Sequence, residues 1–342
     1  MNKKTLALIL LVIVLSFGTW TLIARSRDSH TSVEDAKNKL SLAMDWTPNT
    51  NHTGIYVAKN KGWYKDQDVE LEILPYAASA SADTLVGTSK ADLGISFTES
   101  IVASSVTDAP VTSVAAIIPT NTSSVAVRKG SKIETPKNLD GKTYGGYGAP
   151  YEEPVMKQVI KNSGGEGKFK TVVVDTELID ALESERVDFV WIYDGWQKIQ
   201  AERKGFEIKT FPIIENGIPD YYTPNIISSP KTIDNKTDIL KRFMAATKKG
   251  YDFAAENPEE ASQILVQEAG SEVLPDAEQV RESQIYLASI YKKAKTEWGL
   301  QSESMWQKYP EFMVKNKAVL DLKGEPVSEI NSGLLYTNKL LK

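Results

Sequence analysis

The chain has 342 residues, enough for two domains, and 41% of them are hydrophobic and 25% charged, a balance typical of a folded globular protein. Its formal net charge of −5 argues against a nucleic-acid partner, because such a protein needs a basic face to neutralise phosphates. The sequence has no cysteine and only two histidines, His30 and His52, which excludes disulfides, thiolate metal sites and multi-histidine metal sites. We therefore expect neither a metal nor a cofactor.

The N-terminal segment predicts export from the cytoplasm. Lys3 and Lys4 precede an apolar run, residues 6–24, that holds no charged side chain. A charged start followed by such a run is typical of a signal sequence, and this run is long enough to cross a bilayer. We expect residues 1–24 to be a signal sequence or membrane anchor and residues 25–38 to be a polar tether. The remaining chain is then extracytoplasmic, either tethered to the outer face of the cell membrane or secreted.

Short apolar runs alternate with helical patterns between residues 40 and 228. The patterns predict strands at residues 40–44, 69–73, 93–96, 111–118, 124–127, 142–145, 171–174, 188–192, 207–211 and 225–228. They predict helices at residues 52–61, 82–87, 151–162, 178–182 and 196–204. This alternation favours an α/β fold with parallel sheets.

The pattern after Pro230 is almost wholly helical. Residues 239–254 place their apolar side chains on one helical face, and further helices are predicted from Pro258, at 276–295 and at 302–315. About ten strands are many for one sheet, and the polar segment 128–140 has the composition of a crossover. We predict two lobes joined by a hinge, the first from 39–126 plus 225–342 and the second from 127–224. The helical C-terminal region is expected to pack on the first lobe.

The loop after the first predicted strand carries the densest group of binding-type side chains. It reads Asp45-Trp46-Thr47-Pro48-Asn49-Thr50-Asn51-His52. Loops at strand ends form the ligand crevice of α/β folds, and an indole, amides and an imidazole together suit a flat polar ring. The alternative is that Asn51 or Thr50 only caps the helix and that Trp46 belongs to the core. We favour binding, because capping alone does not require so many such side chains.

Aromatic residues and glycines mark two further strand ends. At least one of Trp191, Tyr193 and Trp196 is expected to face the crevice, although Trp191 could be core and Trp196 could pack its own helix. The loop at residues 145–148 is rich in glycine, which lets a backbone approach a ligand closely. Glu152 and Glu153 follow it at a helix start, where carboxylates are favoured whether or not they bind anything.

Two weaker candidate sites complete the set. Thr98 and Glu99 follow another strand and could line the crevice, or Glu99 could serve as a helix-cap partner. Tyr221 and Tyr222 precede the strand that returns to the first lobe, so we expect them near the hinge.

These motifs together resemble the NMT1/THI5-like family, and within it the ABC-transporter substrate-binding proteins for thiamine pyrimidine precursors. The resemblance rests on Asp45-Trp46-Thr47-Pro48-Asn49-Thr50-Asn51-His52-Thr53-Gly54-Ile55-Tyr56-Val57-Ala58 and on Asp188-Phe189-Val190-Trp191-Ile192-Tyr193-Asp194-Gly195-Trp196. Supporting motifs are Gly94-Ile95-Ser96-Phe97-Thr98-Glu99, Tyr144-Gly145-Gly146-Tyr147-Gly148 and Tyr221-Tyr222-Thr223-Pro224. The resemblance covers roughly residues 40 to 270.

The resemblance implies a periplasmic-binding-protein fold with ligand between two α/β lobes. It implies a monomeric solute-binding protein that delivers a small heterocycle to an ABC permease and its ATPase. The cargo would be hydroxymethyl-pyrimidine or formylaminopyrimidine, with riboflavin or another flat heterocycle as the alternative. The expected ligand-binding residues are Trp46, Asn49, His52, Thr98, Glu99, Tyr147, Glu152, Glu153, Trp191, Tyr193, Trp196 and Tyr222.

An enzyme is the remote alternative. Fungal members of the family make the pyrimidine from pyridoxal phosphate and their own histidine, which would point to His52 as the donor. That chemistry needs a cysteine-rich iron-binding motif, and this chain has no cysteine. We therefore expect a binding protein with no catalytic residues. A tethered sensor ectodomain acting through a signalling partner is a third hypothesis.

Overall fold

Two five-stranded sheets frame the molecule, which a computed structural model describes over residues 38–77, 79–174, 177–293 and 297–342. The first sheet has the order β2-β1-β3-β10-β4. Its strands are β1 (Lys39–Ala43), β2 (Glu70–Leu74), β3 (Leu93–Ser96), β4 (Thr112–Ala116) and β10 (Asn225–Ser228). β1 lies parallel to β2 and β3, whereas β10 runs antiparallel to β3 and β4.

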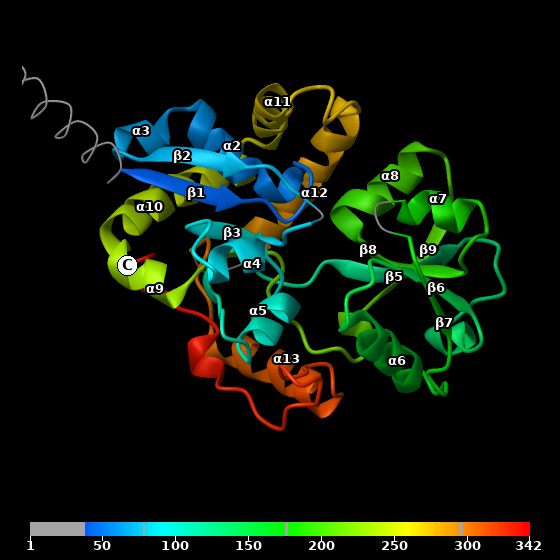
Figure 1. Cartoon of the computed structure of the whole chain (residues 1–342). Coiled ribbons are helices and arrows are strands. Elements are labelled where there is room, and N and C mark those ends of the chain that lie inside the picture. Colours follow the sequence, from blue (N-terminus) through cyan, green and yellow to red (C-terminus); the bar gives the residue numbers. More distant parts are fainter. Residues whose placement is uncertain (1–37, 78, 175–176, 294–296) are drawn as a thin grey trace, which may run out of the picture.

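The second sheet repeats this plan with the order β7-β6-β8-β5-β9. Its strands are β5 (Ser123–Arg128), β6 (Thr143–Gly146), β7 (Lys170–Val173), β8 (Phe189–Tyr193) and β9 (Ile208–Pro212). β6 is parallel to β7 and β8, and β5 is antiparallel to β8 and β9. The predicted two-lobed α/β fold is therefore confirmed, and Figure 1 shows the two lobes side by side.

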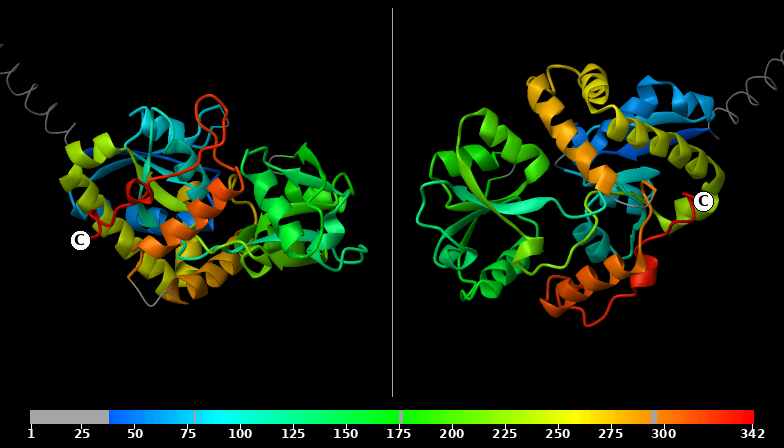
Figure 2. Two further views of the ribbon diagram at one scale, coloured as in Figure 1. Left: turned by 90° about the horizontal axis from the view of Figure 1, so that it is seen from below. Right: turned by 180° about the vertical axis from the view of Figure 1, so that it is seen from behind.

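The chain passes between the lobes through residues 117–122 and 217–224, and Figure 2 shows both crossing segments. The prediction of a crossover at residues 128–140 is wrong, because that segment joins β5 to β6 within the second sheet. Since β5 is buried between β8 and β9, the crossing comes before it, and the predicted limit at residue 126 falls inside β5. The polar composition of 128–140 marks a surface connection.

Helices cover the faces of both sheets. In the first lobe they are α2 (Thr53–Asn60), α3 (Trp63–Asp66), α4 (Ala82–Gly87), α5 (Thr98–Ser104), α9 (Pro230–Asn235), α10 (Thr237–Glu256), α11 (Pro258–Ala269), α12 (Ala277–Lys293) and α13 (Glu303–Lys315). In the second they are α6 (Glu152–Asn162), α7 (Leu178–Glu183) and α8 (Ile199–Arg203). The helical character predicted after Pro230 is confirmed, as is the single buried face of α10.

Helices α2 and α10 pack unusually closely beside the first sheet. A Cβ atom on Gly250 would lie 1.9 Å from the carbonyl oxygen of Gly54, and one on Gly54 would lie 2.3 Å from the ring of Tyr251. Only hydrogen fits at either position, so the two glycines set the distance between the helices. This packing holds the N-terminal end of α2, where the candidate binding loop ends.

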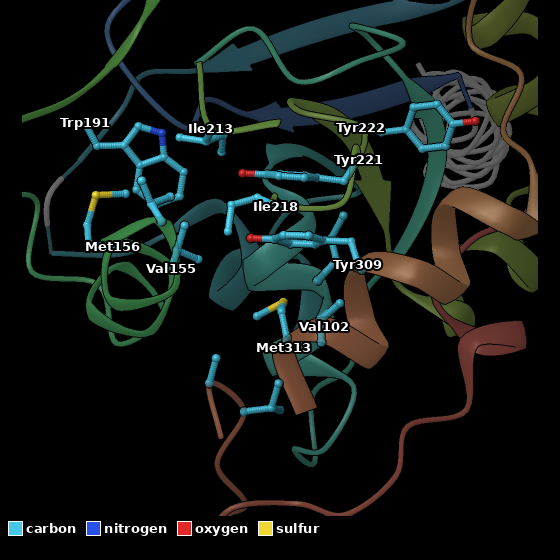
Figure 3. Packing of buried hydrophobic residues seen from close by; sticks show 14 of the residues in the cluster. Val102, Val155, Met156, Trp191, Ile213, Ile218, Tyr221, Tyr222, Tyr309 and Met313 are labelled. Atoms are coloured by element: carbon cyan, nitrogen blue, oxygen red, sulfur yellow. The ribbon is translucent and has the colours of Figure 1, made fainter. Parts of the chain in front are cut away.

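A second core spans the contact between α13, α6 and the segment that returns to the first lobe. Tyr221 and Tyr309 stack with ring centroids 3.7 Å apart and an interplanar angle of 14°. Figure 3 shows the two rings lying one over the other with their hydroxyl groups on the same side, while Trp191 packs beside Met156 on α6. The predicted position of Tyr221 near the hinge is confirmed, since it lies on the returning segment.

Helix α12 belongs to the first lobe but also contacts the second. It packs on α10 and α11, and its other side contacts α8 and the π-helical turn η3 (Asp194–Lys198). Figure 1 places it on the side of the first lobe that faces α8. The buried Ser283 hydroxyl donates to the carbonyl oxygen of Gly195 and lies 2.6 Å from the hydroxyl of Thr50. One side chain thus joins a loop of each lobe.

The described part of the chain contains no helix long and apolar enough to cross a membrane. The predicted signal or anchor and most of the predicted tether fall in residues 1–37, outside the described residues.

Candidate functional site

A cavity of about 230 Å³ lies between the lobes, at the ends of strands β1, β2, β3, β6 and β8. Loops of both lobes and helix α12 contribute its walls. Its lining residues are Asp45, Trp46, Asn49, Thr50, Asn51, Tyr76, Phe97, Thr122, Tyr147, Tyr151, Tyr193, Gly195, Trp196, Gln197 and Leu287. A concave, mainly apolar space with a few polar groups is the usual form of a small-molecule site.

Seven aromatic side chains surround this cavity, three from the first lobe and four from the second. The ring centroid of Trp46 lies 5.1 Å from that of Tyr76 in the same lobe. It lies 5.9 Å from the ring centroid of Tyr147 in the other lobe, and the two ring planes meet at 80°. Phe97 and Tyr193 face each other across the lobes with centroids 6.4 Å apart and planes 20° from parallel. Such an array favours a flat ring, because aromatic stacking adds to the burial of apolar area.

The loop after β1 is fixed by its own hydrogen bonds. The Asn49 side-chain oxygen accepts from the backbone N–H of Asn51 at 3.0 Å, and His52 Nδ1 accepts from the N–H of Asn49 at 3.1 Å. These bonds form a capping box for the short 3-10 helix η1 (Thr50–His52) that precedes α2. The capping role considered for Thr50 or Asn51 falls to Asn49, which also lines the cavity.

His52 is fully buried and positions Asp45. Its Nε2 lies 2.9 Å from Asp45 Oδ1, while Nδ1 is occupied as an acceptor. This hydrogen-bond pattern assigns the neutral tautomer with its proton on Nε2, which donates to the carboxylate. The imidazole therefore lies behind the cavity wall, and Asp45 is the member of the pair that faces the cavity.

The glycine-rich loop after β6 wraps around the carboxylate of Glu152. That carboxylate accepts from the hydroxyl of Tyr144 at 2.7 Å and from the N–H groups of Tyr147 and Ala149 at 3.0 and 2.7 Å. A Cβ on Gly146 would lie 2.1 Å from Glu152 Oε2, so glycine is needed for this approach. The glycines thus serve an internal carboxylate and hold Tyr147 against the cavity.

Buried acids and tyrosines lie directly behind the cavity. Burial raises the pKa of Glu99 above its ordinary value, and Tyr309 donates to Glu99 Oε1 at 3.1 Å. Burial also raises the pKa of Asp83 to about 6, with a further small increase from the charge of Asp45. The pKa of Tyr151, in the cavity wall, is raised well above 10 by burial first and then by neighbouring carboxylates. The environment behind the cavity is therefore acidic and poorly hydrated.

The structure brings five of the residues predicted from sequence into the cavity wall: Trp46, Asn49, Tyr147, Tyr193 and Trp196. The other seven lie outside it. His52, Glu99 and Glu152 are buried behind the wall, with the hydrogen bonds given above.

Four predicted residues have clear structural partners elsewhere. Thr98 donates to the carbonyl oxygen of Tyr222 and accepts from Asn225, so it ties α5 to the returning segment. The Tyr222 hydroxyl contacts Ser302, and the Trp191 indole donates to Ser123 at 2.7 Å. Glu153 is half exposed and pairs with Lys157 one helical turn away.

The set of ligand-binding residues expected from the sequence did not include several lining residues, although three of them belong to the predicted binding loop. The omitted residues are Asp45, Thr50, Asn51, Tyr76, Phe97, Thr122, Tyr151, Gly195, Gln197 and Leu287. Phe97 comes directly after β3 and Tyr76 comes two residues after β2, a signal that could have found them. Leu287 could not have been found in this way, because it lies on α12, far along the chain from the other lining residues.

Comparison with known proteins gives matches of sequence and of structure. Residues 49–261 match the family described as NMT1/THI5 like. The chain is 25% identical over 265 residues to the formylaminopyrimidine-binding protein of Halalkalibacterium halodurans, covering 77% of this chain and 80% of that protein. It is also 25% identical over 240 residues to the 4-amino-5-hydroxymethyl-2-methylpyrimidine phosphate synthase of Legionella pneumophila, covering 69% and 75%.

Solved structures share the fold at low sequence identity. The alkanesulfonate-binding protein SsuA from Xanthomonas axonopodis pv. citri, bound to MOPS, superposes with a TM-score of 0.67 at 12% identity. The match covers 88% of this chain and 99% of that one. The overall fold is thus common to this chain and to that solved structure.

Proposed function

Because the chain belongs to the NMT1/THI5-like family, we propose that it is the solute-binding component of an ABC importer that captures a thiamine pyrimidine precursor. The observation that carries the proposal is the interlobe cavity, where aromatic rings from both lobes surround a small space. The similarity to a formylaminopyrimidine-binding protein supports a pyrimidine as the cargo. Hydroxymethyl-pyrimidine and formylaminopyrimidine are the two candidate precursors, and riboflavin is the alternative cargo.

We assign different roles to the aromatic and the amide side chains of the cavity. Trp46 and Tyr147, which meet across the lobes, would cover the faces of the ligand ring. Asn49, Asn51 and Gln197 would provide hydrogen bonds at its edge, because an amide side chain both donates and accepts. A ring held from both sides draws the lobes together, and we propose that the permease reads this closed form.

A binding role fits the chain better than catalysis. The histidine that an enzyme of this family would need has both ring nitrogens occupied, one by Asn49 and one by Asp45. The described lining residues include no lysine that could form a Schiff base with pyridoxal phosphate. The similarity to a pyrimidine phosphate synthase is therefore taken as common ancestry of the fold and ring site.

We further propose that the protein works outside the cytoplasm as a monomer. The charged and apolar N-terminal sequence supports export, with the segment acting as a signal or as a tether to the outer face of the membrane. The permease and its ATPase would be its protein partners.

Calorimetric titration of the protein tests the proposal. We expect micromolar or tighter binding of hydroxymethyl-pyrimidine or formylaminopyrimidine, and weaker binding of thiamine. Trp46→Ala should reduce affinity by about tenfold, because loss of a stacked indole costs about 1 kcal/mol or more.

The matched control is Trp63→Ala. Trp63 packs against Phe253 on the far side of the first lobe, so its removal should leave affinity unchanged. If only riboflavin binds, the proposed cargo is riboflavin instead of a pyrimidine, and the proposed transport role is unchanged. Absence of heat and of thermal stabilisation with all four ligands would overturn the proposed function.

A further inference from the structure

The described wall of the cavity holds one carboxylate and no cationic side chain. None of its described lining residues is lysine, arginine or histidine, and Asp45 is the one carboxylate among them. The pairing of Asp45 with His52 does not neutralise this charge. His52 Nδ1 accepts the N–H of Asn49, so the imidazole offers Asp45 one hydrogen-bond donor, its Nε2–H. Asp45 Oδ1 takes this bond, and no further hydrogen bond to the carboxylate is found within the described residues.

The position in the second lobe where a bound anion would be expected is already filled. Glycine-rich loops before a helix commonly cradle external anions with their backbone N–H groups. Here the N–H groups of Tyr147 and Ala149 point at the carboxylate of Glu152, which is buried and belongs to the chain itself. An external phosphate or sulfonate would have to displace a carboxylate that holds three hydrogen bonds.

Further carboxyl groups lie near this charge, and burial raises the pKa of Asp83 and of Glu99, so their anions are disfavoured. Asp83 lies close enough to Asp45 for the two charges to interact, and Ser96 donates to Asp83 at 2.5 Å. Glu99 and Glu152 act on each other and on Tyr151 in the wall. A second negative charge placed in this poorly hydrated space would meet repulsion without any ion partner.

We propose that the cavity selects its cargo by charge: it admits a neutral or cationic aminopyrimidine, whose N–H groups are accepted by Asp45, and it excludes the phosphorylated pyrimidine. The inference rests on the proposed function and names the charge class of its ligand. Asp45 is the specificity-determining residue, and His52 is a positioning residue that orients it. Glu152 excludes external anions by occupying the loop that could otherwise bind them. The alkanesulfonate-binding neighbour, by contrast, is named for an anionic ligand.

Three pyrimidines that differ only at one substituent test this inference. The probes are 4-amino-2-methylpyrimidines carrying at C5 a hydroxymethyl group, an aminomethyl group, which is an ammonium at pH 7.5, or a phosphorylated hydroxymethyl group. Full-length protein is titrated with each by calorimetry at low salt. We expect the aminomethyl compound to bind as tightly as the hydroxymethyl compound or more tightly. The phosphate should bind at least about 100-fold more weakly, since uncompensated like charges repel each other at a desolvated interface.

The variant Asp45→Asn keeps the shape of the side chain and removes its charge. We expect the preference for the ammonium over the phosphate to shrink by at least about tenfold. Asp66→Asn, on exposed α3, makes the same change in net charge and should leave the preference unaltered. If Asp45→Asn does not fold, salt dependence of the wild type decides: affinity for the ammonium should fall between 50 and 500 mM salt, and affinity for the neutral compound should not.

The outcomes separate the two proposals. If the pyrimidines bind but the phosphate binds as tightly as the alcohol, or if Asp45→Asn leaves the preference intact, charge selection is overturned and the proposed function stands. If no pyrimidine binds at all, the proposed function fails and the inference falls with it.

Discussion

At the scale of single residues, the candidate site depends on side chains that never touch the cavity. His52 orients Asp45 and Asn49, and Glu152 orders the loop that carries Tyr147. Sequence alone could nominate these residues, because they lie in the right loops. It could not separate the residues in the wall from those behind it, since that depends on which way each side chain turns from its backbone.

Asp83 carries a pH dependence of stability that can be measured. Burial raises its pKa to about 6 from an ordinary value near 3.8. Between these two values the folded state holds more protons than the unfolded state, so the free energy of unfolding falls as pH rises through this interval. Asparagine has the same shape, is neutral and can still accept from Ser96. In Asp83→Asn the free energy of unfolding should therefore fall less as pH rises, by up to about 3 kcal/mol.

Urea unfolding of wild type and variant at pH 4.5 and 7.5 checks this expectation. The quantity compared is the change in free energy of unfolding between the two pH values. Asp66→Asn serves again as the exposed control and should not alter that change. Equal pH dependence in wild type and Asp83→Asn would show that this carboxyl titrates normally.

At the scale of elements, the close contact between α2 and α10 should reverse the usual effect of a Gly→Ala substitution on stability. In an exposed helix, Gly→Ala stabilises by about 0.5–1 kcal/mol. In α10, Gly250→Ala would place a methyl group 1.9 Å from the backbone oxygen of Gly54, so we expect net destabilisation of about 1–3 kcal/mol. The midpoint of urea unfolding measures it, with Ala245→Ser on the exposed face of α10 as the control, expected to change it by less than about 0.5 kcal/mol. A gain in stability would mean that the helices can move apart.

The elements themselves were largely predictable, because hydrophobic periodicity is a local signal. Every predicted strand has a counterpart among β1 to β10, and the apolar face predicted along residues 239–254 is part of the buried face of α10. The short helices α3, α5 and α9 were not predicted, whereas the similarly short α4 and α7 were. The predicted helix at 196–204 is a π-helical turn followed by α8, a distinction that depends on hydrogen bonding rather than on pattern.

Topology was harder to predict than the elements. The polar segment 128–140 was predicted to be the crossover between the lobes, but the chain crosses earlier, through a short stretch before β5. Which sheet a strand joins is fixed by long-range pairing, here of β5 with β8 and β9, and no local composition encodes it.

At the scale of the whole molecule, α12 couples the lobes independently of the two crossing segments. Ser283 bonds to Gly195 of the second lobe and to Thr50 of the first, both of which line the cavity. At the N-terminal end of α12, Arg203 of α8 forms a bidentate pair with Asp276, which immediately precedes the helix. The position of the lobes relative to each other therefore depends on this helix.

Ser283→Ala should weaken ligand binding without touching the ligand. Loss of the two hydrogen bonds destabilises the arrangement in which Ser283 joins the two loops by about 1 kcal/mol or more. This corresponds to roughly a fivefold to tenfold loss of affinity. Calorimetry with the preferred pyrimidine measures this loss, and small-angle scattering should show a less compact liganded form. Ser289→Ala, on the exposed side of the same helix, is the control. A variant that is less heat-stable but binds normally would restrict Ser283 to a structural role.

The placement of the tryptophans has a consequence for detection. Trp46 and Trp196 line the cavity, one from each lobe, while the other tryptophans of the described residues lie outside its wall: Trp63, Trp191, Trp298 and Trp306. A heteroaromatic ring stacked on an excited indole quenches its emission, and closure of the lobes changes the solvent around both indoles. The protein thus contains its own optical reporter of occupancy. Single-tryptophan variants could time the arrival of the ligand and the movement of each lobe separately, without any attached dye.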